Sequence, residues 1–328
     1  MNNQKIKNLE LNKSTCDIVT EWNILDSLRN EIYIELNPKF VNSLKYQFKN
    51  RGILQKVLAK RLNVVRPTVS QWFSSNTKIP YKAIIKFFEI LNINKNSLIR
   101  NIDGIALDSG IVKFHKPHIV IKFDKNFARF LGHIYGDGSV RSNFTVSFTN
   151  LNKDLVNDFI SLVKKIFGDV DCYIYNDDND GTINVTLPLL IGKFLVKCFE
   201  DIQNKNIPVK HLLSNNYSIP EFIGALFDGE GYVSVKKRYL EIQLSKQHML
   251  EDLKILFSAI GIETSSIYKK VNQNWGFMYR ISIYRRKKTH IICLYICQLL
   301  LALVDDFRTL DWTKYYPYAA INLKEIKT

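Results

Sequence analysis

Two similar stretches of sequence, FLGHIYGDGS (Phe130–Ser139) and FIGALFDGEG (Phe222–Gly231), determine how the rest of the chain is interpreted. Each is a short apolar run of the kind that forms a buried helix, and each ends in glycine, an acid and glycine. The two acids are Asp137 and Glu230. The sequence therefore predicts two hydrophobic helices that each end at a single carboxylate.

Both runs also carry signals for where the helix begins and what it packs against. Asp124 precedes the first run, and Ser218 and Glu221 stand in capping-box spacing before the second. Small residues recur within the runs, and side chains this small let two helix backbones approach closely. The expected packing positions are Gly132, Gly224 and Ala225. We therefore expect the two helices to pack against each other and to end side by side.

The two acids are an unfavourable choice at these positions unless a cation accompanies them. A carboxylate at a helix C-terminus faces the negative end of the helix dipole, at a cost of roughly 0.3–1 kcal/mol. Two such carboxylates brought together also repel each other. A divalent cation with hard oxygen ligands, such as Mg²⁺, removes both costs and can activate water beside a phosphate. The pattern indicates a metal site formed by Asp137 and Glu230.

These motifs resemble those of the LAGLIDADG homing endonucleases of the single-chain, two-motif type. The matching residues are LGHIYGDG, which contains Asp137, and GALFDGEG, which contains Glu230. The resemblance implies a monomeric enzyme that uses Mg²⁺ or Mn²⁺, and no organic cofactor, to hydrolyse double-stranded DNA at a specific site. It also implies a mobile genetic element, such as an intron, as the source of the gene. The last acid of each motif would bind the metal, giving a ligand set of Asp137, Glu230, Gly136 and Gly229.

The segments that follow the two motifs have the same order. Each motif is followed by two alternating strands, a helix, two more strands and a second helix; NFTVSFT (143–149) and YLEIQLS (239–245) are examples of the strands. This is the duplicated αββαββα arrangement of the family, an α+β fold in which two antiparallel four-stranded sheets form a saddle over DNA. The resemblance covers about residues 124 to 316.

The outward-facing residues of these strands are mostly Thr, Ser, Asn, Gln and Arg, which can hydrogen-bond base edges in a major groove. A polar face is ordinary for an antiparallel sheet, so this assignment depends on the resemblance. The expected DNA-contacting residues of the first sheet are Thr145, Ser147, Thr149, Thr182, Asn184 and Thr186. Those of the second half are Ser234, Lys236, Lys237, Arg238, Gln243, Ser245, Arg280, Ser282 and Tyr284, and Glu241 is expected to face outward with them.

Basic residues near the scissile phosphates are expected in this family. Lys246, at the end of a second-half strand, and Arg285 are the catalytic candidates. The first half has no evident counterpart, because Leu187-Pro188 occupies the strand end that we take as equivalent. His133 lies on the first motif helix, where a histidine is more often a packing residue than a base. Asp228, two residues before the second acid, is expected to pack or to cap.

A strongly basic block precedes the duplicated unit. From Leu36 to Arg100 there are thirteen Lys or Arg against one acid, and apolar residues recur at helical spacing. The segments LQKVLAKRLNV and RPTVSQWFSSN resemble the second and third helices of the Cro and phage-repressor class of helix-turn-helix domains. The resemblance implies a recognition helix whose groove-facing residues are Arg66, Thr68, Ser70 and Gln71. The alternative is an all-α bundle that packs on the rest of the chain without binding DNA.

The charge of the whole chain favours a nucleic-acid partner. The net charge is +15, and a second basic block, from Tyr232 to Lys288, has twelve Lys or Arg against four acids. Between the blocks, Ser139–Pro188 has four basic residues against seven acids. Two basic blocks favour a polyanion such as double-stranded DNA as the partner, although a solvated lysine-rich surface has the same composition.

The sequence divides into a helix-turn-helix part, a duplicated part and connecting segments. The predicted boundaries are an unassigned extension 1–35, the helix-turn-helix domain 36–100, a linker or short strand pair 101–123, two halves 124–215 and 216–316, and a tail 317–328. The polar N-terminus lacks a signal-peptide pattern, and the longest apolar run, Ile291–Val304, is too short to span a membrane. Five cysteines without a Cys-x-x-Cys pair favour a reduced, cytoplasmic protein.

Three functions are compatible with these motifs: a DNA endonuclease, a DNA-binding transcriptional regulator that has lost cleavage, and an intron RNA maturase. The presence of both Asp137 and Glu230 favours the endonuclease, since a regulator has no need of them. We expect no protein splicing. An intein begins with Cys or Ser and carries His-Asn before its downstream junction, whereas this chain begins Met1-Asn2-Asn3 and ends KEIKT.

Overall fold

A computed structural model describes residues 18–284, apart from residues 75–76, 108–109, 200, 216, 235–238 and 273–275. Several predictions therefore lie outside the described residues: those for Lys236, Lys237, Arg238 and Arg285, and those for the apolar run Ile291–Val304. The chain forms two compact units. Among the described residues, one unit contains Ile18, Ala128–Asp137 and the residues from Lys205 to Tyr284, and the other contains Val19–Phe127 and Gly138–Asn204.

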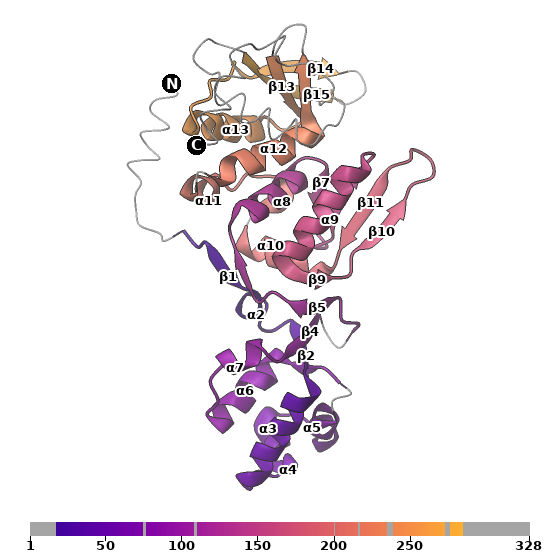
Figure 1. The fold of residues 1–328 in the computed structure, drawn as a ribbon, viewed down its shortest axis with the longest axis vertical. Helices are drawn as coiled ribbons and strands as arrows, with labels where there is room; N and C mark the ends of the chain where they lie inside the picture. The colour runs from indigo at the N-terminus through magenta and orange to yellow at the C-terminus, as the bar shows by residue number, and fades with distance from the viewer. Residues whose placement is uncertain are drawn as a thin grey trace, which may run out of the picture. The chain divides into compact units, whose positions relative to one another are not determined.

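The first half contains a four-stranded antiparallel sheet with the order β10-β11-β8-β7. Its strands are β7 (Gly138–Val140), β8 (Val146–Asn150), β10 (Tyr173–Asn176) and β11 (Ile183–Leu187). The helices α9 (Lys153–Phe167) and α10 (Leu189–Cys198) follow the two hairpins, and Figure 1 shows α9 beside the sheet. Alternation along β8 buries Val146 and Phe148, and the Phe148 ring stacks on Phe159 of α9 with centroids 4.5 Å apart.

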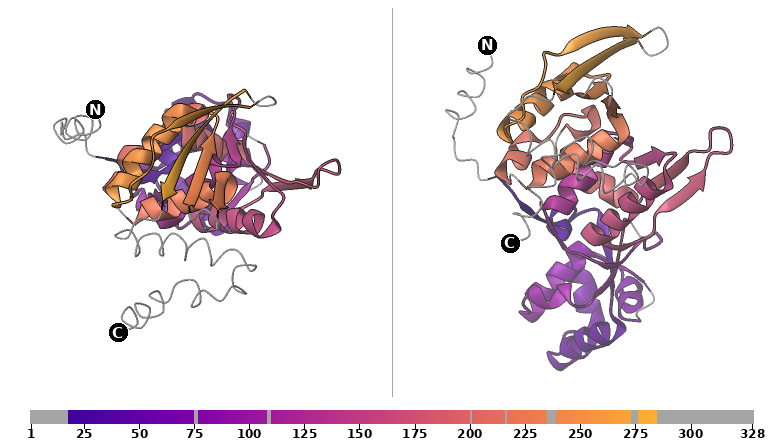
Figure 2. Two further views of the ribbon diagram at one scale, coloured as in Figure 1. Left: turned by 90° about the horizontal axis from the view of Figure 1, so that it is seen from above. Right: turned by 45° about the horizontal axis from the view of Figure 1, so that its top comes forward.

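The second half repeats this arrangement. Its elements are α12 (Ser218–Glu230), β12 (Gly231–Ser234), β13 (Tyr239–Leu244), α13 (Gln247–Ala259), β14 (Tyr268–Asn272) and β15 (Gly276–Tyr284), after a short α11 (Val209–Ser214). The sheet order is β12-β13-β15-β14, so that in both sheets the last strand lies beside the second. Figure 2 shows β14 and β15 as a projecting antiparallel hairpin. The predicted α+β fold with two antiparallel four-stranded sheets is confirmed.

The two motif helices begin differently. In α8 (Lys125–Tyr135), the Asp124 carboxylate accepts a hydrogen bond from the Phe127 amide at 2.9 Å, as the sequence predicts for a helix start. The N-cap of α12 is Tyr217, and the Ser218 hydroxyl is buried in the first turn without a hydrogen-bond partner. The predicted capping box is therefore wrong, and Glu221 has another partner, described below.

The basic block folds into helices α3 (Pro38–Asn50), α4 (Gln55–Leu62), α5 (Arg66–Phe73) and α6 (Tyr81–Leu91), followed by α7 (Asn96–Ile99). Gly52, with a φ of +66°, ends α3, and Asn63, with a φ of 55°, turns the chain between α4 and α5. Val69 and Trp72 are buried, and Phe73 stacks on Phe87 of α6 with ring centroids 5.7 Å apart. Aromatic packing against α6 thus fixes which face of α5 stays outside.

Short strands connect this helical domain to the first half. The sequence analysis allowed for a strand pair within 101–123 but did not predict the strands outside that segment. A five-stranded sheet has the order β3-β2-β4-β5-β9, with strands β2 (Ile32–Leu36), β3 (Ile79–Pro80), β4 (Ile102–Leu107), β5 (Phe114–Pro117) and β9 (Gly168–Val170). A further pair joins β1 (Glu21–Asn23) to β6 (Val120–Lys122). The segment 101–123 therefore contributes three strands, and β9 follows directly on α9.

Two of the five cysteines belong to the described residues. Cys172 and Cys198 are free thiols, and burial raises their pKa to about 11 and about 12. Among the described helices, none combines the length and the apolar composition that crossing a bilayer requires.

Candidate functional site

The two motif helices pack directly on each other through small residues. A Cβ atom at Gly132 would lie 2.4 Å from the carbonyl oxygen of Phe222 and 2.8 Å from the Cβ of Ala225, so no side chain fits there. At Gly224, a Cβ would meet nothing within 4 Å. The structure thus places Gly132 and Ala225 at the helix contact and leaves Gly224 out of it.

This packing brings the two acids together where the helices end. A Cβ at Gly229 would lie 2.6 Å from Oδ2 of Asp137, so the Asp137 carboxylate lies against the backbone just before Glu230. Burial raises the pKa of Glu230, the negative charge of Asp137 raises it further, and the positive charge of Lys205 lowers it. The two carboxylates are therefore close enough to interact, as a shared cation site requires.

A third charged group at these helix ends, Lys205, was missed from the sequence. It follows the 3-10 turn η1 (Ile202–Asn204), and its Nζ donates to the carbonyl oxygens of Tyr135 at 3.1 Å and Gly136 at 2.9 Å. Burial lowers the pKa of Lys205, Lys246 lowers it as well, and Glu230 and Asp137 raise it. Nothing in the surrounding loop sequence distinguishes this lysine from its neighbours.

The structure places Lys246, the predicted catalytic lysine, close to Lys205. Lys246 is the half-buried N-cap residue of α13, and its charge acts on Lys205. The corresponding N-cap of α9 is Asn152, whose side chain accepts a hydrogen bond from the Asp154 amide at 2.8 Å. The first-half equivalent of Lys246 is therefore Asn152 and not the strand end at Leu187-Pro188. The lysine whose charge acts on Glu230 is Lys205, and Lys246 lies close enough to Lys205 to act on it.

An ion-pair cluster links the motif helices beside the Gly132 contact. Arg129 of α8 lies 3.8 Å from Oε2 of Glu221 and 3.7 Å from Oδ2 of Asp228, both on α12. The side chains of Arg129 and Asp228 are only 12% and 6% exposed, and charges this buried are costly unless they are paired. Asp228 therefore has a packing role, and His133, which is also buried, belongs to the helix core.

The donors at the helix ends suit a hard divalent cation. Within the part of the chain that the structure describes, no three His, Cys, Asp or Glu side chains gather as metal ligands. A cation held by Asp137 and Glu230 would therefore complete its shell with carbonyl oxygens and water, as Mg²⁺ commonly does. Of the two predicted carbonyl ligands, Gly136 accepts a hydrogen bond from Lys205, and Gly229 adjoins Asp137. The donor set fits Mg²⁺ or Mn²⁺.

The outward face of the first sheet carries small, neutral polar groups. The Ser147 hydroxyl lies 2.9 Å from that of Ser139, and the Thr149 hydroxyl donates to the Asn184 side-chain oxygen at 2.6 Å. Thr182 stands just before β11, in the turn that joins β10 to β11. Ser147, Thr149 and Asn184 therefore have side-chain partners within the protein and are half-buried.

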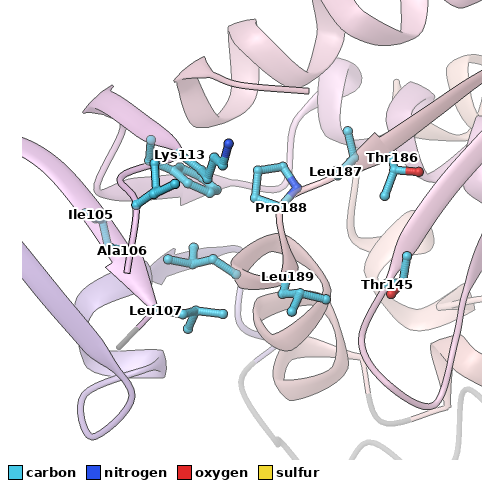
Figure 3. Close-up of a pocket in the computed structure, with 12 residues that line it drawn as sticks. Ile105, Ala106, Leu107, Lys113, Thr145, Thr186, Leu187, Pro188 and Leu189 are labelled. Atoms are coloured by element: carbon cyan, nitrogen blue, oxygen red, sulfur yellow. The ribbon is translucent and has the colours of Figure 1, made fainter. Parts of the chain in front are cut away.

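Two further predicted first-half contacts, Thr145 and Thr186, line a cavity of about 320 Å³, and Thr186 lies opposite Ser147 on the sheet. Figure 3 shows Thr145 and Thr186 on one side of this cavity and Leu107 and Leu189 on another. Apart from the threonines and Lys113, the lining consists of apolar residues of β4, β5, β11 and α10 and their loops. These two threonines therefore border an apolar hollow.

The outward face of the second sheet is organised around a buried acid. Glu241 is 4% exposed, although strand alternation predicts an outward position. Its carboxylate accepts hydrogen bonds from Gln243 at 2.6 Å, Ser282 at 3.2 Å and Arg280 at 3.5 Å. Ser282 is buried with Glu241, whereas the Arg280 side chain is 41% exposed. Glu241 therefore holds the side chains of Arg280 and Gln243 in position.

The remaining predicted DNA contacts differ in exposure. In the second half, Ser234 is buried, and Ser245 and Tyr284 are exposed. On α5, Thr68 is half-buried, and the exposed residues are Arg66, Ser70 and Gln71. The accessible part of the predicted contact set therefore lies mainly on α5 and around Arg280.

Comparisons with known proteins give a family-model match within the second half and relatives that match longer parts of the chain. A family model for a LAGLIDADG-like domain matches residues 219–297. A glutamine–fructose-6-phosphate aminotransferase of Methanocaldococcus jannaschii is 23% identical over 54% of this chain and 17% of its own length. A probable translation initiation factor IF-2 of the same organism is 24% identical over 76% of this chain and 22% of its own length. The chain thus spans about a fifth of the length of these relatives.

Among solved structures, two matches are LAGLIDADG proteins, and both have low sequence identity and a low TM-score. The homing endonuclease I-DmoI in complex with DNA and Mn is 17% identical, with a TM-score of 0.39 over 52% of this chain and 95% of that chain. The N-terminal LAGLIDADG domain of DUF199/WhiA is 14% identical, with a TM-score of 0.38 over 53% of this chain and 82% of that chain.

Proposed function

We propose that this protein is a divalent-metal-dependent endonuclease that cleaves double-stranded DNA at a specific site. The observation that carries this proposal is the pair of carboxylates, Asp137 and Glu230, at the adjoining ends of α8 and α12. A packing role gives no reason to place two acids there, because the helix dipoles and their mutual repulsion both oppose it. A cation that activates water beside a phosphate gives such a reason.

The chain's own residues contribute binding and orientation to this chemistry. Asp137 and Glu230 would hold Mg²⁺ or Mn²⁺, which when bound lowers the pKa of water and stabilises charge on a phosphate. The helix contact at Gly132 makes the carboxylates converge, and Arg129 braces the same two helices. Lys246 supplies positive charge beside Lys205, whose charge acts on Glu230, and positive charge here would stabilise the negative charge that grows as the phosphodiester bond breaks.

Two surfaces supply the DNA contacts that a specific nuclease needs. On the second sheet, Glu241 fixes Gln243 and Arg280, whose side chains can pair with adenine and guanine edges. On the basic helical domain, α5 exposes Arg66 and Gln71, and we propose it as the recognition helix of a helix-turn-helix. The excess of lysine and arginine in both regions suits the phosphate backbone.

The matched relatives support an origin in a mobile element. An aminotransferase and a translation initiation factor have unrelated names, yet each is matched over about a fifth of its length. A segment similar in both cannot account for either named activity, so it is an additional element in each. A gene that spreads by cutting DNA at a specific site is an element of this kind.

The decisive experiment tests cleavage of the sequence that flanks the gene. The full-length protein is incubated with Mg²⁺ and a supercoiled plasmid that carries the two flanks joined without the insertion. We expect linear product with the wild type and none with Asp137→Asn. Binding without cleavage in both Mg²⁺ and Mn²⁺ would indicate a DNA-binding regulator instead, and selective binding of intron RNA would indicate a maturase.

A further inference from the structure

Lys205 is held at the end of α8 by backbone contacts. Its Nζ lies 2.9 Å from the carbonyl oxygen of Gly136 and 3.1 Å from that of Tyr135. Its backbone φ of 59° is in the left-handed region, which costs energy for a residue other than glycine, so the surrounding structure imposes this conformation. The Gly136 oxygen is also one of the carbonyl ligands that we propose for the metal.

The charges around Lys205 match those that a cation at this place would meet. Glu230 and Asp137 attract the ammonium group, and Lys246 repels it. Without any cation, the two carboxylates would repel each other at the adjoining helix ends. Because Lys205 is half-buried, its attraction to them is screened less than on the surface. The lysine therefore supplies the positive charge that the acid pair needs when no metal is bound.

We infer that Lys205 is the resident cation of the Asp137–Glu230 pair in the metal-free protein and competes with a divalent cation for the Gly136 carbonyl oxygen. This inference rests on the proposed function, because it takes the helix ends to be a metal site. Two positive charges at one oxygen repel each other, so the ammonium and the metal occupy it in turn. Lys205 is thus a positioning residue, which keeps the two carboxylates converged until the metal takes over.

The first test measures the charge coupling without metal. Thermal unfolding of the full-length wild type, Lys205→Met, Asp137→Asn and the double variant is followed in EDTA. We expect Lys205→Met to lower the Tm by several degrees in the wild type and by clearly less in the Asp137→Asn background, because only the complete acid pair needs the ammonium. An equal loss in both backgrounds would overturn the inference, since it would mean that Lys205 only caps the end of α8.

A matched control separates this coupling from the loss of any buried lysine. Lys254 also donates its ammonium to a backbone carbonyl, that of Ser265, at 3.1 Å. We expect Lys254→Met to change the Tm by the same amount with aspartate or asparagine at position 137. A dependence on Asp137 as large as that of Lys205→Met would overturn the inference, because the coupling would not be specific to Lys205.

The second test measures the competition directly, by Mn²⁺ binding in electron paramagnetic resonance titrations. Lys205→Met should bind Mn²⁺ roughly tenfold more tightly than the wild type, because a competing positive charge is gone. Unchanged or weaker binding would overturn the competition. If the wild type and Asp137→Asn bind Mn²⁺ equally, the metal site of the proposed function fails, and with it the competition. The unfolding measurements would still decide whether Lys205 is the resident cation.

Discussion

The two four-stranded sheets have the same strand order but different outward faces. On the first, neutral groups pair with each other, as in Thr149 with Asn184. On the second, the buried carboxylate of Glu241 organises Gln243 and Arg280. The segments that contain the two sheets also differ in net charge. Ser139–Pro188 has more acids than bases, and Tyr232–Lys288 has more bases than acids.

The difference between the two outward faces shows which positions of a duplicated fold can differ between its halves. The inward positions of both sheets must stay apolar, as Phe148 and Ile242 do, because they form the core. The outward positions do not belong to the apolar core, so they can be adapted separately in each half. A single chain with two unlike faces has no need of the two-fold symmetric target that a homodimer reads. We therefore expect a DNA target whose two sides differ in sequence.

The largest effect is expected at the acids, which are the feature that the two halves share. Asp137→Asn and Glu230→Gln should each abolish double-strand cleavage, because each removes a carboxylate from the metal site. The affinity for DNA should stay within a few-fold of the wild type, since few phosphate contacts are lost. Plasmid linearisation and gel shifts measure the two quantities. Full cleavage by either variant would exclude that acid from the active site.

The next largest effect is expected where the motif helices cross. Gly132→Val should lower the free energy of unfolding by about 3 kcal/mol or more, the upper end for overpacked positions, because backbone atoms of Phe222 block the new side chain. Gly224→Ala is the matched control, and it should be neutral or stabilise the protein by up to about 1 kcal/mol through helix propensity. Urea unfolding measures both. Similar losses in both variants would mean that the helices do not meet at Gly132.

A third experiment asks whether the basic helical domain contributes to DNA binding. Arg66→Ala combined with Gln71→Ala should weaken binding by roughly 10²-fold and shorten the footprint on one side, because base contacts are worth about 1–3 kcal/mol each. Cleavage at saturating protein should survive. Substitution is preferable to deleting residues 1–105, which would also remove β2 and β3 from the five-stranded sheet. Unchanged affinity and footprint would identify the helical domain as a packing bundle.

A fourth experiment compares the two sheet faces directly. Arg280→Ala should weaken DNA binding by about tenfold and reduce the slope of log affinity against log salt by up to about one unit, because a charged contact is lost. Thr149→Ala should leave the salt slope unchanged, since its hydroxyl is already paired with Asn184 and carries no charge. Equal salt slopes for Arg280→Ala and the wild type would mean that this arginine serves the fold alone.

The duplicated fold could be predicted because its signals are local. The alternation in β8 and β13, the apolar helices and the two acid-ended motifs each lie within a short stretch of sequence. The convergence of Asp137 and Glu230 followed from the small residues at Gly132 and Ala225, one on each motif helix.

Other features depend on contacts that no local pattern contains. Lys205 reaches the Gly136 carbonyl across 69 residues of sequence, so only the folded chain shows that it belongs to the site. The strands β3, of two residues, and β9, of three, are too short to display an alternating pattern. Alternation assigns Glu241 to the outward face but cannot show that Arg280, Gln243 and Ser282 cover it.

The smallest effect is expected at Glu31, whose charge serves the structure of the first half. Its carboxylate forms ion pairs with Lys193 at 2.5 Å and Lys197 at 2.9 Å, both on α10. The hydrogen bond from Lys193, followed by that from Lys197, lowers the pKa of Glu31 below its ordinary value of 4.5. The stabilisation from these pairs is therefore present above the unfolded-state pKa and is lost as the pH falls through the lowered pKa.

Glu31→Gln should thus reduce the free energy of unfolding by about 1 kcal/mol or less at pH 7, because partly exposed ion pairs contribute little. The difference from the wild type should disappear as the pH falls below the lowered pKa, and cleavage should not change at any pH where both proteins are folded. Glu241→Gln breaks an ion pair in the second half and is the counterpart. It should weaken DNA binding, because Arg280 then loses the carboxylate that positions it. Impaired cleavage in Glu31→Gln would contradict a purely structural role for Glu31. An effect of Glu241→Gln on stability alone would contradict a role for Glu241 in DNA binding.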